Sequence, residues 1–220
     1  MKGMLKLGLV LALFAAAACV MLAFVYTGTE QIIAQRQQDD LQAALKELFP
    51  DADSFTPVSD IQSPDASVTI ETAYAAMKNG QPAGAALRLS RASYGGPIKI
   101  MTGVSLDSTI TGVKILEHSD TPGLGANAAS SSYFVVRLKK FGWFAGKLDP
   151  SMGITFYGQF TGKSVTDPFV VKEDVDAITA STITSSAVTA AVKAAGIGVT
   201  AWLAGVDVNA ISGALEGGAK

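Results

Sequence analysis

A run of hydroxyl-bearing side chains at residues 176–188 is the richest chemical feature of this chain, reading D-A-I-T-A-S-T-I-T-S-S-A-V. The residues that follow, 185–195, have the composition of a helix, and Gly196 is its predicted stop. Thr182 is then expected just before a helix N-terminus, where unpaired N–H groups and the helix dipole favour a phosphate. A capping turn without any ligand would use the same residue types.

A second segment with chemical potential is the loop at residues 118–125, reading H-S-D-T-P-G-L-G. Pro122 fixes its own φ, while Gly123 and Gly125 can adopt backbone conformations that are closed to other residues. Such a loop can bring bare backbone N–H groups close to a flat, polar ring system. A tight surface turn between strands is the plain alternative for a Pro-Gly pair.

These two segments, in this order and roughly sixty residues apart, resemble the motifs of a known FMN-binding family. The family includes the G subunit of the Rnf complex and the C subunit of the sodium-pumping NADH:quinone reductase. Weaker similarities are found at residues 94–97 and 156–163. The resemblance covers residues 65–195 and, with the N-terminal anchor, is most similar to the Rnf branch of the family in length and spacing.

The resemblance implies that a flavin transferase joins the phosphate of FMN to Thr182 through a phosphoester, with Asp176 and Thr179 marking the recognition sequence. Ala180 and Ser181 depart from the family pattern, which usually has Gly and Ala there. The other residues that it implies for cofactor binding are Tyr94, His118, Thr121, Pro122, Gly123, Leu124, Gly125, Thr184 and Ser185. For His118, a structural hydrogen-bonding role is the alternative.

The implied function is electron transfer by covalently bound FMN within an ion-translocating ferredoxin:NAD oxidoreductase of the Rnf type. Such a chain is a redox subunit of a translocase and is not catalytic alone. The implied partners are the other membrane, iron–sulfur and flavin subunits of the complex, and the flavin transferase during maturation. Three alternatives remain open at this point: the FMN subunit of the quinone reductase, a flavin-free membrane-anchored binding or sensing domain, and an extracellular adhesion or scaffold module.

The rest of the composition excludes several other classes. Cys19 is the only cysteine and His118 the only histidine, so disulfides, thiolate clusters and multi-histidine metal sites are not expected. We therefore predict no catalytic side chain and no metal site. A net charge of −2 gives no broad basic face for nucleic acid. No glycine-rich dinucleotide fingerprint follows a predicted strand, so NAD itself is not an expected ligand.

An uncharged stretch near the N-terminus predicts a membrane anchor. Residues 7–25 are almost wholly apolar and, as a helix, would span about 28 Å. Lys2 and Lys6 precede this stretch, so the N-terminus is predicted in the cytoplasm and the main domain on the periplasmic or extracellular side of the inner (cytoplasmic) membrane. A cleaved signal peptide, or a lipoprotein site at Cys19, is the alternative.

The predicted fold is α+β: a twisted, mostly antiparallel sheet with packed helices, preceded by one transmembrane helix. The predicted parts are 1–29 (cytoplasmic tip and membrane helix), 30–64 (helical stalk and linker) and 65–220 (extracytoplasmic FMN-binding domain). Thr184 or Ser185 is the predicted N-cap of the helix after the hydroxyl run. Further predictions are a helix at 30–49 ended by Pro50, a linker or loose edge at 51–66, and strands at 67–77, 83–90, 98–106 and 109–116 with an Asn79-Gly80 turn. Toward the C-terminus we predict a helix at 126–141, short strands at 154–160 and 164–169, and a packed helix or tail at 199–215.

Overall fold

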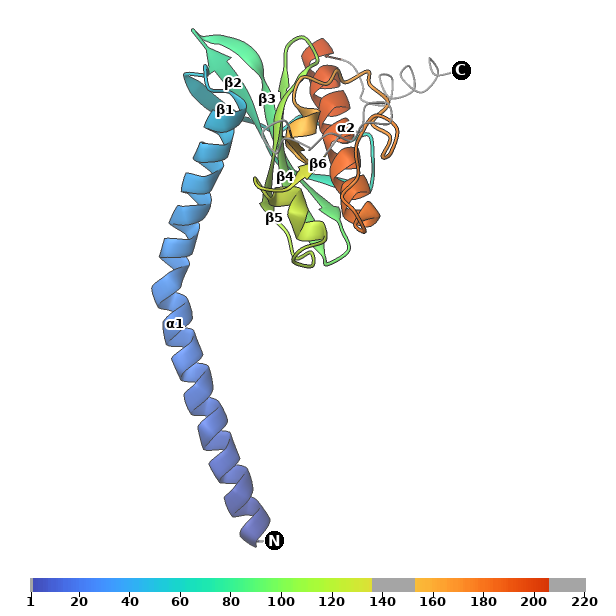
Figure 1. The fold of residues 1–220 in the computed structure, drawn as a ribbon. Coiled ribbons are helices and arrows are strands. Elements are labelled where there is room, and N and C mark those ends of the chain that lie inside the picture. Colours follow the sequence, from blue (N-terminus) through green and yellow to red (C-terminus); the bar gives the residue numbers. More distant parts are fainter. Residues whose placement is uncertain (1, 136–152, 206–220) are drawn as a thin grey trace. The chain divides into compact units, whose positions relative to one another are not determined.

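The computed structural model describes residues 2–135 and 153–205 of the chain (Figure 1). The chain divides into two compact units, Met1–Ala43 and Ala44–Lys220. The division predicted from the sequence, with boundaries after residues 29 and 64, stays a prediction. The described elements are helix α1 (Lys2–Leu48), strands β1 (Ser54–Val58), β2 (Val68–Lys78), β3 (Gln81–Ala92), β4 (Pro97–Ser105) and β5 (Ile110–Glu117), 3-10 helix η1 (Gly125–Ala129), strands β6 (Phe134–Val135) and β7 (Ile154–Thr155), 3-10 helix η3 (Gly158–Phe160) and helix α2 (Thr182–Ala204).

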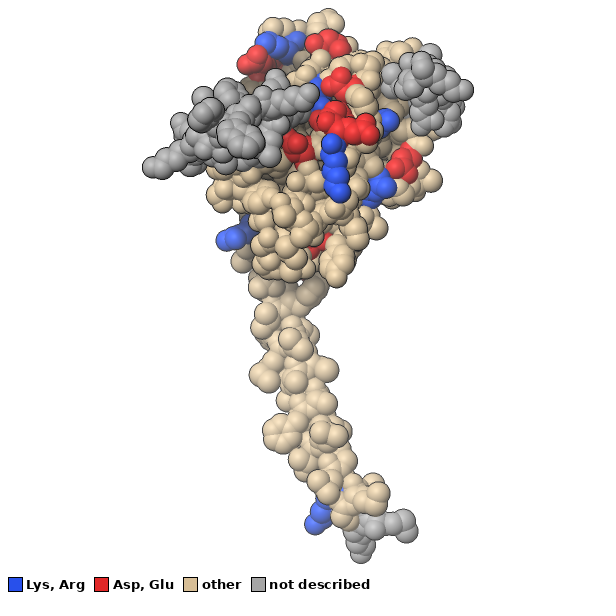
Figure 2. All heavy atoms as spheres, turned by 45° about the vertical axis from the view of Figure 1, so that its right-hand side comes forward, with Lys and Arg blue, Asp and Glu red and all other residues tan. Residues whose placement is uncertain are grey.

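Helix α1 runs without a break from the apolar stretch into the predicted stalk. The sequence predicts a separate helix from residue 30, but nothing ends the first helix there, because the first proline of the chain is Pro50. Both α1 and α2 are long and apolar enough to cross a membrane, yet 67% of the apolar window of α2 is buried in the fold and none of that of α1. Figure 2 shows the long uncharged surface of α1, with basic atoms near its N-terminal end.

Strands β1 to β5 form one antiparallel sheet in chain order, as the α+β prediction requires. The predicted turn between β2 and β3 is confirmed, because Asn79 and Gly80 both have positive φ, at 52° and 75°. Two consecutive left-handed residues are the geometry that the right-handed twist of a two-residue hairpin needs. The two longest strands of the sheet, β2 and β3, are therefore paired through a tight two-residue turn.

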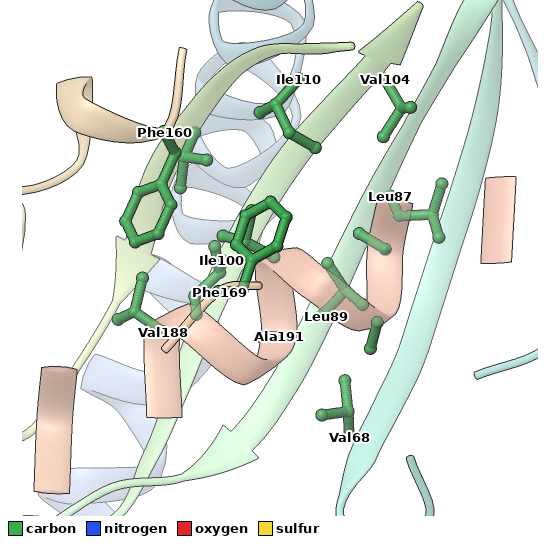
Figure 3. Close-up of a cluster of buried hydrophobic side chains, with 14 of the residues drawn as sticks. Val68, Leu87, Leu89, Ile100, Val104, Ile110, Phe160, Phe169, Val188 and Ala191 are labelled. Carbon is green, nitrogen blue, oxygen red and sulfur yellow. The ribbon is translucent and has the colours of Figure 1, made fainter. Parts of the chain in front are cut away.

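One face of the sheet packs against α2 (Figure 1). Alternate residues of β3 and β4, among them Leu87, Leu89 and Ile100, point into this core and are fully buried. The facing side of α2 presents small residues such as Val188 and Ala191 (Figure 3). Because small side chains let the helix axis approach the sheet closely, most of α2 is buried from its second turn onward.

The opposite face of the sheet carries three glycines on neighbouring strands, Gly84, Gly103 and Gly112, which we call the glycine seat. Leu48 and Phe49, both buried, lie in it. A Cβ atom at Gly112 would come 2.9 Å from Leu48 Cδ2, and one at Gly84 would come 2.9 Å from Phe49 Cε1. The last turn of α1 therefore belongs to the second compact unit, where it packs against the face of the sheet that α2 leaves uncovered.

Three predicted elements differ from the structure in type or extent. The predicted helix at 126–141 begins instead as η1 and then becomes the short strand β6, while residues 136–141 lie outside the described part. The Ser130 hydroxyl accepts a hydrogen bond from the Ser132 N–H at 3.3 Å, a local bond that competes with helix propagation. The predicted strand at 154–160 is only two residues long and continues as η3. The predicted strand at 164–169 is reduced to a single bridge between Thr109 and Ser164.

Residues 51–66, predicted as a linker or loose edge, contain the edge strand β1, which pairs with β2. Two further predictions need correction in extent. Gly196 does not stop α2, which continues to Ala204 and ends at Gly205 in the left-handed conformation with φ 64°. Gly196 is needed for packing instead, since a Cβ there would lie 2.8 Å from Val165 Cγ2. Of the predicted helix at 199–215, residues 199–204 are the end of α2, and residues 206–215 lie outside the described part.

The glycine seat predicts a coupled pair of substitutions. Gly112→Ala is expected to lower the free energy of unfolding by about 1–3 kcal/mol, because the new methyl group overlaps Leu48 Cδ2. Leu48→Ala alone is expected to cost about 2–5 kcal/mol through lost burial. Urea unfolding of the full chain in detergent, followed by tryptophan fluorescence, measures both.

The double variant is the control for this interpretation. In the Leu48→Ala background the clash partner is gone, so Gly112→Ala should then cost little. Strictly additive effects would show that Gly112 is sensitive for a reason other than its contact with Leu48.

Candidate functional site

Helix α2 starts earlier in the chain than either of the predicted N-caps. Thr182 is its first residue, with an exposed side chain, and Ser181 is the N-cap. The sequence predicted Thr184 or Ser185 as the cap, but Ser185 is buried inside the first turn. The Ser185 hydroxyl donates to the Ser181 carbonyl at 2.9 Å and accepts from the Ile178 N–H at 2.9 Å. Since Ser181 makes no side-chain capping bond, the first-turn N–H groups stay uncapped by it.

The start of the hydroxyl run is held by a buried amide, Gln159. Its Nε2 donates to the Asp176 carbonyl at 3.0 Å, and its Oε1 accepts from the Asp176 N–H at 2.8 Å. A further bond from Nε2 to the Phe156 carbonyl, also 3.0 Å, fixes the orientation of the amide. Gln159 was not predicted as a site residue, although it lies in the weakly similar segment 156–163. Its signal was a lone polar residue between two aromatic residues that are both fully buried in the fold.

The turn between Asp176 and Thr182 contains one residue in an unfavourable conformation. Ala180 has φ 58°, in the left-handed region that glycine adopts at no steric cost. This is the position at which the family pattern usually has glycine, so the geometry gives a physical reason for that preference. Thr179, next to it, is exposed, and its N–H donates to Tyr133 Oη at 3.4 Å.

A second group of contacts joins segments that are far apart in the chain. The Asp120 carboxylate accepts hydrogen bonds from Ser93 Oγ at 2.6 Å, from the Gly95 N–H at 2.6 Å and from Thr184 Oγ1 at 2.9 Å. We call these four residues the Asp120 junction. It connects the segment around Tyr94, the loop at 121–125 and the first turn of α2. Neither Ser93 nor Asp120 was predicted as a site residue.

Two glycines make this close approach possible. A Cβ at Gly125 would lie 2.6 Å from Thr184 Oγ1 and 2.9 Å from Asp120 Cγ. A Cβ at Gly95 would overlap the backbone carbonyl of Ser119. Gly123, by contrast, has open space around it and is needed for its φ of 78°. The loop predicted from its Pro-Gly content is therefore packed against α2 at one end and open at the other.

Burial and hydrogen bonding act in opposite directions on the Asp120 carboxyl. Burial raises its pKa, but the bonds from Ser93, Gly95 and Thr184, with a smaller effect of the His118 charge, outweigh it and leave the pKa below the usual 3.8. His118 is half-buried, and its Nδ1 makes no hydrogen bond within the described part of the chain. The junction is thus built to hold an ionised carboxylate.

Three exposed apolar side chains are next in sequence to residues of the junction or to Gly125, which packs against it. Tyr94, Leu124 and Ile183 are 73%, 42% and 57% exposed, and each is next in sequence to a residue that contacts Asp120 or packs against it. Thr121 and Pro122 are exposed as well. The structure therefore brings the Tyr94 segment, the Thr121–Gly125 loop and Thr184 together. Asp176 and Thr179 are held separately, by Gln159 and Tyr133.

The segment that leads into Asp176 is braced by a half-buried ion pair. Lys163 Nζ lies 2.9 Å from Asp174 Oδ2. The same carboxylate accepts from the N–H groups of Phe169 and Val170. Burial raises the pKa of Asp174, but the hydrogen bond and charge of Lys163 and the two backbone N–H groups lower it below 3.8. The Lys163–Asp174 ion pair therefore holds the residues just before the hydroxyl run, while Gln159 holds Asp176 at the start of the run.

Comparison with known proteins places these segments in a family. A family profile described as an FMN-binding domain matches residues 93–196, and one described as the RnfG N-terminal region matches residues 1–48. The G subunit of an ion-translocating oxidoreductase complex from Aliivibrio fischeri is 34% identical over 202 residues, which cover 87% of this chain and 88% of the relative. The chain belongs to the RnfG family. The Asp120 junction and the hydroxyl run both lie inside the FMN-binding match.

Two further G subunits and one solved structure are also similar to this chain. The G subunit of the Na(+)-translocating ferredoxin:NAD(+) oxidoreductase complex of Acetobacterium woodii is 30% identical, over 87% of this chain and 89% of its own. The G subunit of an ion-translocating oxidoreductase complex from Methanosarcina acetivorans is 29% identical, with 88% and 93% covered. The crystal structure of Shewanella oneidensis NqrC is similar over 77% of this chain and 73% of its own, at 18% identity and a TM-score of 0.40.

The left-handed conformation of Ala180 predicts that glycine, the usual family residue at this position, makes the folded chain more stable. Ala180→Gly is expected to raise the free energy of unfolding by about 1 kcal/mol, because it removes the steric cost of the left-handed conformation. Ala177→Gly, three residues earlier and without positive φ, is the matched control and should lower it by about 0.4–1 kcal/mol. Chemical denaturation of the full chain distinguishes the two. Equal losses in both variants would contradict the conformational explanation.

The low pKa of Asp120 predicts a specific loss of stability in acid. As the pH falls below 3.8, the unfolded chain takes up the proton first, so the contribution of the carboxylate is lost as the pH falls through the folded-state pKa. The difference in unfolding free energy between wild type and Asp120→Asn should therefore be constant at neutral pH and shrink over this range. The exposed Asp60→Asn variant is the control. A pH-independent difference would show that the side chain acts only by packing.

Proposed function

We propose that this chain carries FMN covalently on Thr182 and transfers electrons as a subunit of an ion-translocating ferredoxin:NAD oxidoreductase complex. The observation that carries the proposal is the position of Thr182: an exposed hydroxyl on the first residue of a 23-residue helix, inside the FMN-binding match. The remaining complex subunits and a flavin transferase are its proposed partners. The names of the relatives support this assignment.

The local geometry favours Thr182 over its neighbours as the attachment residue. Thr184 is 1% exposed, and its hydroxyl is committed to Asp120. Ser185 is fully buried, and its hydroxyl both donates and accepts within the turn. An approaching transferase could reach neither oxygen without opening the first turn of α2. Thr182 requires no such opening.

The residues present fit a phosphate-linked flavin. The N–H groups of the first turn of α2 and the positive end of its dipole would bind the phosphate. Tyr94, Leu124 and Ile183 offer exposed apolar surface for a planar ring beside the Thr121–Gly125 loop. When bound, FMN supplies the redox chemistry, for which the chain has no side-chain substitute. Asp176 and Thr179 would be read by the transferase, and Gln159 would hold that part of the turn in place.

Thr182→Ala tests the attachment residue. This variant, produced with a flavin transferase, should fold but show no flavin fluorescence in a denaturing gel, because the ester oxygen is gone. Thr182→Ser keeps a hydroxyl and should retain at least part of the signal. Ser186→Ala is the matched control, since Ser186 is another exposed hydroxyl on the same helix, and it should be labelled like wild type. Persisting fluorescence in Thr182→Ala would refute the assignment, and a colourless wild type would favour a flavin-free binding domain.

We further propose that α1 crosses the inner membrane once and that the FMN-binding domain lies outside the cytoplasm. Its apolar window contains no buried residue, and Lys6 precedes it. A Cys19→Ala, Gln81→Cys chain gives a single reporter at an exposed hairpin position. A membrane-impermeant maleimide should label it in intact cells, or in spheroplasts where an outer membrane intervenes. Labelling only after lysis would reverse the proposed orientation.

A further inference from the structure

We propose that Asp120 is a positioning residue: through Thr184, it sets where the start of α2, and hence a cofactor attached at Thr182, lies relative to the Thr121–Gly125 loop. The inference rests on the proposed attachment at Thr182. It assigns to Asp120 the orientation of the bound group, which is separate from its attachment.

The Asp120 carboxylate, which directly precedes the Thr121–Gly125 loop, is hydrogen-bonded to the segment around Tyr94 and to the first turn of α2. Oδ1 accepts from the Gly95 N–H, and Oδ2 accepts from both hydroxyls of the junction. The donors are 25, 27 and 64 residues away from Asp120 in sequence, so the bonds are long-range. Asp120 itself is only 5% exposed. Buried hydrogen bonds to a charged group are among the stronger non-covalent links in a protein.

The backbone packs closely around the Asp120 carboxylate at two glycines. Gly125 is the last residue of the loop and has no room for a single added carbon against Thr184 and Asp120. Gly95 is equally confined against Ser119. The distance between loop and helix is therefore set by contact on one side and by hydrogen bonds on the other. Without the hydrogen bonds to Asp120, only the packing contact would remain. That contact prevents the loop and α2 from moving closer together, but it does not prevent them from moving apart.

An ester at Thr182 cannot by itself orient a flavin. It fixes one end of a long, rotatable chain, so the position of the ring depends on the surfaces that the tether brings within reach. Thr184 lies in the same helical turn as Thr182 and is the residue through which that turn is bonded to Asp120. Asparagine at position 120 would place an NH2 group where donors already point, and at least one bond would be lost.

A cofactor-free measurement tests the link itself. In the Thr182→Ala chain, which lacks the proposed attachment oxygen, Asp120→Ala and Thr184→Val form a double-mutant cycle read by urea unfolding, because alanine leaves no acceptor for Thr184 Oγ1. If the two residues act through one bond, the double variant is hardly less stable than Asp120→Ala alone. Ser186→Ala in place of Thr184→Val is the matched control and should be additive. Additivity of Thr184→Val would overturn the proposed link.

A second measurement tests the effect on the bound group. Wild type, Asp120→Asn and Thr184→Val are modified by the transferase, and the signal of each chain is scaled to the amount of FMN that it carries. The FMN attached to the two variants should show lower fluorescence anisotropy and a higher iodide quenching constant than in wild type, shifted toward free FMN. Asp60→Asn should match wild type. If Asp120→Asn does not fold, Thr184→Val, which removes one bond of three, still decides the matter.

The outcomes separate the two proposals. FMN attached in the variants with the anisotropy and quenching of wild type would refute the positioning role while leaving the attachment intact. A wild-type chain that takes up no FMN would refute the proposed function. The cofactor-free cycle would then still report whether Asp120 links the loop to α2.

Discussion

Helix α2 has to satisfy two opposing demands, and much of the domain follows from them. Its body must be buried against β3 and β4 to close the core, yet its first residue must remain in solvent. Small side chains along its inner face allow the first demand, because they bring the helix axis close to the sheet. The second depends on the sharp turn at 178–181, which Ser185 holds from inside the helix and which Ala180 enters at the cost of a left-handed backbone. A core element thus also carries the exposed hydroxyl.

Two polar side chains keep this arrangement in register. Gln159 bonds to backbone atoms on both sides of its amide, so the segment before the turn is fixed without using the side chains of that segment. Asp120 does the complementary work after the turn, where it connects α2 to loops from two other parts of the chain. Both groups are nearly buried and fully used in hydrogen bonds, which makes them more costly to replace than surface polar residues.

Local patterns predicted much of this structure. The alternation in β2 to β5, the Asn79-Gly80 turn and the long apolar N-terminal helix follow from periodicity and turn chemistry, and they are confirmed. The predicted helix at 126–141 failed because three consecutive serines favour local side-chain bonds over helix propagation. Gly196 was misread as a stop because close packing against Val165 outweighs its low helix propensity.

The motif residues were predictable, but their supports were not. Thr182 and the Pro-Gly loop stand out as patterns of residue types within short windows. Ser93, Asp120 and Gln159 act through long-range contacts, and a lone serine, aspartate or glutamine in a sequence carries no sign of its distant partner. The departure at Ala180 could be seen in the sequence. Its physical cost became clear only from the φ angle.

The residues of the Asp120 junction lie far apart in the sequence, and this separation determines when the junction can form during synthesis of the chain. Thr184 bonds to groups 64 and 91 residues earlier, so the junction cannot close until most of the polypeptide has been synthesised. The glycine seat behaves in the opposite sense: Leu48 and Phe49 are made early and wait for β5 before they are covered. Pairings over such distances form late, since their loop-closure entropy must be met first. During biogenesis, helix α1 therefore exists well before the Asp120 junction can form.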